Sequence, residues 1–141
     1  MKKKLYTAIG LMSGTSMDGI DLSIISSDGL HEFSNILDDY YEYDKNLQDQ
    51  LVRLRDLVLT KKDLLQNSEK LRELERNLTL FHADAVNQSL KKYRETIDLI
   101  GFHGQTIFHS PHEKITNQLG DGKLLSQIIK KKLFMILGKK I

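Results

Sequence analysis

Small polar residues that can bind an anion gather in one short segment near the start of the chain, "SGTSMDGID" at residues 13–21. The segment separates two apolar runs and carries Ser13, Thr15 and Ser16 beside glycines. A glycine-centred reversal between two strands can aim successive backbone N–H groups into one concavity, and the three hydroxyls add further donors. This set of donors suits the oxygens of a phosphate group.

Two carboxylates in the same segment add a second kind of chemistry. Asp18 or Asp21 could hold Mg²⁺, directly or through water, as a phosphoryl-transfer site requires. The segment is neither a P-loop nor a dinucleotide fingerprint, because no strand-to-helix turn with either glycine pattern is present. The simpler alternative is an ordinary hairpin turn in which Asp and Ser cap their own backbone, and composition alone favours it.

A second polar group occupies the stretch "FHGQTIFHSPH". If residues 97–108 form one strand, His103 and Gln105 share a face of it, where they could hydrogen-bond a sugar hydroxyl or a carbonyl. A zinc site would use His103, His109 and His112, but the chain lacks the cysteine ligands and the HExxH spacing typical of zinc sites. Histidines at a strand end that bond their neighbours are the simpler interpretation.

A third candidate is Asp121, which stands between two glycines in "QLGDGKLL". The pattern predicts a turn followed by a short helix. A helix N-terminus can bind an anion, although Asp121 as the N-cap of that helix is the simpler role and is compatible with a place in a site.

Composition indicates one globular domain of 141 residues. The formal charge of +2 argues neither for nor against nucleic acid, and the absence of cysteine excludes disulfides and thiolate metal sites. The basic and apolar start "MKKKLYTAIGLM" is shorter than a signal peptide requires and has no cleavage pattern. We therefore expect a cytoplasmic protein without a membrane or nucleic-acid partner.

Apolar periodicity predicts an α/β domain. The first three strands should form an antiparallel meander, because Asp28-Gly29 is a hairpin signal. The expected elements are strands at 4–12, 20–26, 31–43 and 97–108, helices at 46–59 and 64–92, and a short helix after Asp121.

The long helix at 64–92 should bury one face. Leu71, Leu74, Leu78, Phe81 and Ala85 recur at spacings of three and four, which is the period of an amphipathic helix. The charged residues between them should face solvent.

Three of these stretches resemble one family. "GLMSGTSMDGID", "GFHGQT" followed by "HSP", and "QLGDGKLL" occur in the order and spacing of the anhydro-N-acetylmuramic acid kinases, over residues 5 to about 129. The resemblance implies the N-terminal lobe of the sugar-kinase, heat-shock-protein and actin fold, which is ribonuclease H-like. It also implies an enzyme that hydrolyses the bridge of 1,6-anhydro-N-acetylmuramic acid and phosphorylates O6 with ATP and Mg²⁺ in cell-wall recycling.

The same resemblance assigns roles to residues. It makes one turn the first phosphate loop, facing ATP, and that loop comprises Gly14, Thr15, Ser16, Met17, Asp18, Gly19, Ile20 and Asp21. It places His103 and Gln105 near the sugar in the central cleft, and we count Asp121 with them as a candidate substrate contact.

The end of the chain departs from the family pattern. Family members continue into an apolar strand and a "DFR" motif whose aspartate is the expected general base, followed by a second lobe. Here no Asp or Glu follows Asp121, so we expect no catalytic residue in this chain. We divide it into a lobe at 1–129 and a basic, apolar tail at 130–141. Three hypotheses follow: a truncated inactive remnant, half of a split kinase completed by a separate C-terminal chain, or a non-enzymatic ligand-binding module.

Overall fold

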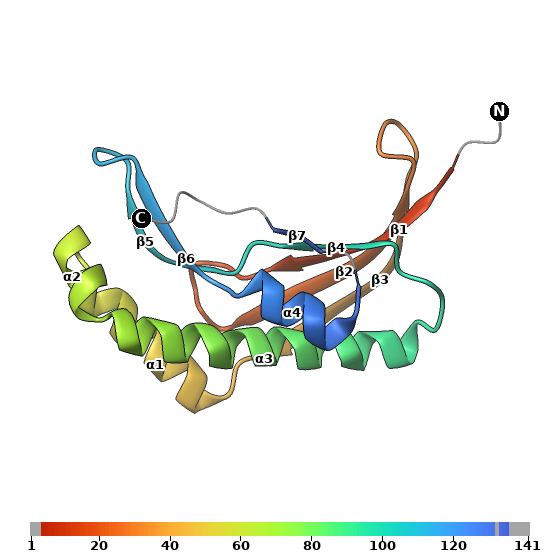
Figure 1. Cartoon of the computed structure of the whole chain (residues 1–141). Helices are drawn as coiled ribbons and strands as arrows, with labels where there is room; N and C mark the ends of the chain where they lie inside the picture. Colours follow the sequence, from red (N-terminus) through yellow and green to blue (C-terminus); the bar gives the residue numbers. More distant parts are fainter. Residues whose placement is uncertain (1–3, 132, 136–141) are drawn as a thin grey trace.

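The computed structural model describes residues 4–131 and 133–135. Within them, an opening run of three strands is followed by three helices, three further strands, a helix and a last strand (Figure 1). The strands are β1 (Tyr6–Met12), β2 (Gly19–Ser27), β3 (Phe33–Glu42), β4 (Leu99–Phe102), β5 (Gln105–Ser110), β6 (Ile115–Leu119) and β7 (Leu133–Met135). The helices are α1 (Lys45–Leu57), α2 (Lys61–Gln66), α3 (Ser68–Lys92) and α4 (Gly122–Ile129).

The main sheet has the strand order β3-β2-β1-β4-β7. β1 pairs with β2 and β2 with β3 in antiparallel fashion, which agrees with the expected meander. β4 lies parallel to β1 on its other side, and β7 lies parallel to β4. β7 falls within residues 130–141, which we expected to be a tail; residues 132 and 136–141 of that segment lie outside the described residues.

The core lies between this sheet and its helices. Alternate residues of β1 and β2 are buried, among them Ile9, Leu22 and Ile24, whereas Met12 and Asp21 are exposed. The long helix α3 runs beneath the sheet with α1 and α4 on the same side (Figure 1). The buried side chains, at every second position of the strands, therefore face the apolar side of α3.

The expected helix at 64–92 is two helices in the structure. α2 starts earlier, at Lys61, after a capping box formed by Thr60 and Asp63, and it ends at Gln66. The backbone N–H and the side chain of Asn67 both bond to the carbonyl of Asp63, which closes α2 before α3 begins. The predicted apolar face of α3 is otherwise confirmed, because Leu71, Leu74, Leu78 and Ala85 are buried and Phe81 is partly buried.

The expected single strand at 97–108 was also wrong. It breaks at Gly104, whose φ of +71° is left-handed, so only β4 belongs to the main sheet. β5 instead pairs with β6 in a separate two-stranded sheet. β6 was not expected, since its residues, "ITNQL", are mostly polar and follow a turn at Pro111. Asp121 is the N-cap of α4, as expected, and its carboxylate accepts a bond from the N–H of Leu124.

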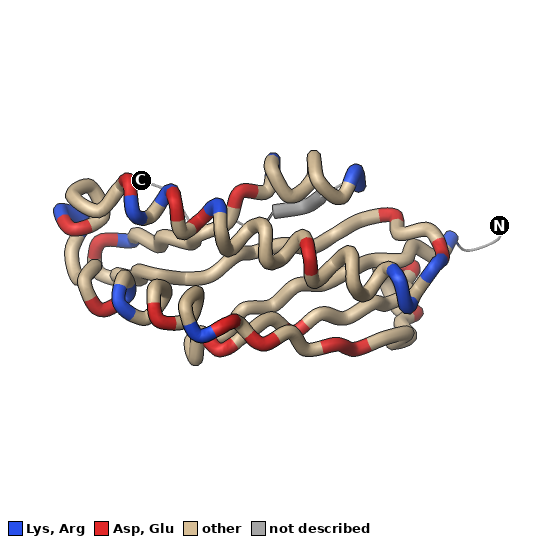
Figure 2. Tube along the Cα trace, turned by 90° about the horizontal axis from the view of Figure 1, so that it is seen from below, with Lys and Arg blue, Asp and Glu red and all other residues tan. Residues whose placement is uncertain are grey.

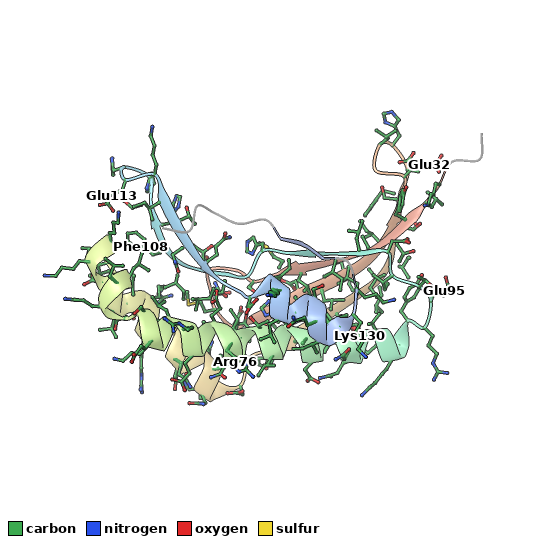
Figure 3. The ribbon with its side chains drawn as sticks, in the orientation of Figure 1. Glu32, Arg76, Glu95, Phe108, Glu113 and Lys130 are labelled. Atoms are coloured by element: carbon green, nitrogen blue, oxygen red, sulfur yellow. The ribbon has the colours of Figure 1, made fainter. Side chains whose placement is uncertain are left out.

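The surface of the helices carries charges of both signs. Basic and acidic residues are interspersed along α1 and α3 (Figure 2). The two hairpins rise at opposite ends of the molecule, with Glu32 near the tip of β2–β3 and Glu113 near the tip of β5–β6 (Figure 3). Among the described residues, none of the helices combines the length and the apolar character that crossing a bilayer demands.

Candidate functional site

The segment between β1 and β2 is an irregular turn without helix. Met17 adopts a left-handed φ of 55°, its side chain is 1% exposed, and its N–H donates to the carbonyl of Gly14 across 3.3 Å. A non-glycine residue in this conformation costs on the order of 1–3 kcal/mol and persists only where its surroundings enforce it. The buried Met17 side chain therefore anchors the turn in the core.

The tip of this turn presents donors to solvent. Thr15 and Ser16 are exposed, and their backbone N–H groups have no hydrogen-bond partner within the described part of the chain. Unpaired N–H groups beside hydroxyls make an anion-binding concavity when the turn contains a left-handed residue. These two N–H groups can therefore donate to phosphate oxygens without breaking a hydrogen bond of the turn.

Asp18 is the carboxylate nearest this tip. Its side chain is exposed and accepts a bond from Ser16 Oγ across 2.5 Å. That bond, with help from the N–H groups of Asp18 and Gly19, holds the pKa of the Asp18 carboxyl below its usual value. Asp21 is exposed on β2, opposite Met12. The described residues contain no group of three or more metal-ligating side chains, so Mg²⁺ here would take one or two carboxylates together with phosphate oxygens.

Behind the turn lies a buried polar chain that sequence reasoning missed. Ser13, 5% exposed, accepts a bond from the Tyr43 hydroxyl and lies 3.1 Å from Nε2 of His82. His82 Nδ1 contacts the carbonyl of Leu78, and burial, with His103 nearby, lowers the pKa of His82 to about 4. Its place one turn after Leu78, on the buried face of α3, was the signal that could have revealed it.

The environment of Tyr43 is equally closed. Burial raises the pKa of its hydroxyl to about 12, and its ring packs edge-on against Phe81 with centroids 5.1 Å apart. The ring of His82 packs in the same manner against Phe102 at 5.0 Å. Both polar side chains are thus held by aromatic neighbours.

Gln105 connects the second motif to the turn. Its side chain is fully buried, and Nε2 donates to the carbonyl of Gly14 across 2.9 Å, while Oε1 has no partner among the described residues. Gln105 therefore faces the turn from the interior of the protein. His103 is half-buried, and the break at Gly104 means that these two residues do not share one strand face.

The three histidines of this stretch are not gathered into a metal site. His109 is exposed and bonds to Thr116, and His112 is exposed in the turn after β5. Among the described residues, no three or more His, Cys, Asp or Glu side chains gather closely enough to hold a metal ion, which argues against the zinc alternative.

The second and third motifs meet through glycines. A Cβ on Gly104 would collide with the carbonyl oxygen of Leu119, and one on Gly120 would lie 2.7 Å from the ring of Phe102. The N–H of Asp121 donates to the Thr79 hydroxyl on α3 at 3.0 Å. The third motif is therefore packed against the second and against α3, and the Asp121 carboxylate is used as a helix cap.

Comparison with known proteins gives a consistent result. The family model described as anhydro-N-acetylmuramic acid kinase matches residues 6–135. A relative of that name from Pelagibacter ubique is 52% identical over 129 residues, covering 92% of this chain and 34% of the relative. Those from Agrobacterium fabrum and Rhizobium etli are 43% and 42% identical, over 88% and 86% of this chain. The chain spans about a third of the length of these relatives.

Proposed function

Because the chain belongs to the anhydro-N-acetylmuramic acid kinase family, we propose that its β1–β2 turn holds the phosphates of ATP in the 6-phosphorylation of 1,6-anhydro-N-acetylmuramic acid. The observation that carries this proposal is the exposed tip of the turn, where the N–H groups of Thr15 and Ser16 are unpaired beside two hydroxyls. The proposed fold is the N-terminal lobe of the sugar-kinase and actin class. The antiparallel meander, with β4 parallel to β1, supports that assignment.

We propose that a carboxylate at the edge of the turn binds Mg²⁺. Asp18 is exposed and, like any exposed aspartate, is charged at neutral pH; the bond from Ser16 holds the pKa of its carboxyl below the usual value. Asp18, or Asp21 on the adjoining strand, would hold the ion, whose charge neutralises phosphate oxygens when it is bound.

For the sugar, His103 is the better candidate of the second motif. It is half-buried, whereas Gln105 is fully enclosed and already bonded to Gly14. Asp121 is half-buried with its carboxylate on the N–H of Leu124, so its contribution to a sugar site would be through the position of the loop.

We propose further that residues 1–141 alone do not catalyse the reaction. Phosphoryl transfer depends on positioning and charge stabilisation from both walls of a cleft. About two thirds of each relative has no counterpart in this chain, and no carboxylate follows Asp121 to serve as a base. Loss of a general base alone removes about 10²–10⁴ in rate.

The test is incubation of the purified chain with ATP, Mg²⁺ and the anhydro sugar, with and without a second chain that represents the remaining two thirds of a relative. We expect no N-acetylmuramic acid 6-phosphate from residues 1–141 alone. Product only in the mixture supports a split kinase, and ATP binding without product in either supports a binding module. Turnover by the chain alone, abolished by Asp18→Asn, would overturn the proposal of inactivity.

A further inference from the structure

The carbonyl of Gly14 is held from inside the protein by two donors. Gln105 Nε2 lies 2.9 Å from it and the N–H of Met17 lies 3.3 Å from it. A peptide unit is planar and its C=O and N–H point in opposite directions when it is trans. With the Gly14 carbonyl directed at the buried Gln105, the N–H of Thr15, in the same peptide unit, must point away from the core.

The residue before Gly14 is held by a bond chain whose direction can be deduced. The carbonyl of Leu78 can only accept, so the nitrogen that faces it, His82 Nδ1, carries the proton. In the neutral ring Nε2 is then an acceptor, and the Ser13 hydroxyl donates to it. The Tyr43 hydroxyl donates in turn to Ser13 Oγ. In this series of bonds, the hydroxyls of Tyr43 and Ser13 and both ring nitrogens of His82 each have a partner.

We infer that Gln105, Tyr43 and His82 are positioning residues of the phosphate turn, which fix Ser13 and Gly14 from within so that the Thr15 N–H and the neighbouring donors face a bound phosphate. This inference rests on the proposed function. It gives Gln105 a role in holding the turn instead of contacting the sugar. Loss of the partner of a buried donor costs free energy, because the donor is then left without a hydrogen bond in a low dielectric.

The test uses two conservative variants of the full chain and one matched control. Tyr43→Phe removes only the hydroxyl that reaches Ser13, and Gln105→Met removes the amide at nearly constant length. Tyr41→Phe is the control, because its hydroxyl bonds Ser89 at 2.7 Å and Asp39 at 3.1 Å in a separate polar cluster between β3 and α3. Thermal melts establish that each variant is folded; if Gln105→Met is not, Tyr43→Phe decides the test alone.

Two quantities are measured: hydrogen exchange of the Met17 amide and the dissociation constant of ATP with Mg²⁺. We expect Tyr43→Phe and Gln105→Met to accelerate Met17 exchange and to weaken ATP binding, each by about two- to tenfold, the change that loss of one hydrogen bond produces. Tyr41→Phe should change neither, even where it lowers the melting temperature as much. If the Met17 exchange rate and the ATP affinity of Tyr43→Phe and Gln105→Met equal those of the control Tyr41→Phe, the inference is overturned.

The two measurements also separate this inference from the proposed function. If the unmodified chain binds no ATP, the proposed phosphate role fails, and the exchange of the Met17 amide alone decides whether the anchors order the turn. If ATP binds equally to the unmodified chain and to both anchor variants, the phosphate role stands and the positioning role is refuted.

Discussion

The side-chain amide of Gln105 donates a hydrogen bond to the carbonyl oxygen of Gly14 across 2.9 Å, although 91 positions separate the two residues in the chain. The bond joins the start of β5, just after the break at Gly104, to the turn between β1 and β2. It shows that two of the motifs that attract attention in the sequence belong to one spatial unit. The properties of that unit can be tested by substitution.

The junction of the second and third motifs predicts a strict requirement for glycine at position 104. Gly104→Ala must place a Cβ against the carbonyl of Leu119 while keeping a left-handed backbone at a φ of +71°. We expect a loss of at least about 2 kcal/mol in the free energy of unfolding, measured by urea denaturation. The matched control is Gly10→Ala in β1, because a Cβ there meets nothing within 4 Å. Equal stability of the two variants would refute this packing.

The core of the lobe depends on the buried face of α3. Leu78 is fully buried and Leu80, two residues later on the same helix, is 41% exposed. We expect Leu78→Ala to lower the free energy of unfolding by about 2–5 kcal/mol, because it leaves a cavity beneath the sheet. Leu80→Ala should cost less than about 1 kcal/mol. A urea midpoint unchanged in Leu78→Ala would contradict the core assignment.

The buried imidazole of His82 predicts a dependence of stability on pH. Burial lowers its pKa from 6.5 to about 4 in the folded chain, so between these values the unfolded state binds a proton that the folded state does not. Stability contributed by the neutral ring is therefore complete above pH 6.5 and is lost as pH falls toward 4, by about 1.4 kcal/mol per pH unit for a single proton.

Urea denaturation as a function of pH measures this dependence. The slope between pH 6.5 and 4 should decrease in His82→Gln and should persist in His109→Gln, since His109 is exposed. The same slope in both variants would show that other groups account for the acid sensitivity.

Much of this architecture could be predicted from the sequence because it depends on patterns among neighbouring residues. The alternation in β1 and β2 and the three-four spacing in α3 are properties of neighbouring residues, and they gave the meander, the turn at 13–19 and the face of α3. The N-cap Asp121 was likewise visible beside its helix.

The features that were missed depend on distant partners. The break at Gly104 is explained by the carbonyl of Leu119, and β6 exists only as the partner of β5. A polar strand such as β6 has no apolar alternation to reveal it. His82 meets Ser13 across 69 positions, and a periodicity of apolar residues does not single out a histidine among them.

The β1–β2 turn is expected to bind phosphate, and a titration followed by backbone amide NMR tests this central claim most directly. The chain is titrated with ATP and Mg²⁺, and separately with adenosine and Mg²⁺ as the control without phosphates. We predict that ATP shifts the amide signals of Thr15 and Ser16 most strongly, with smaller changes through Gly19, and that adenosine leaves them in place. Unmoved Thr15 and Ser16 signals, with ATP-induced changes confined to another face of the protein or absent, would contradict the central claim.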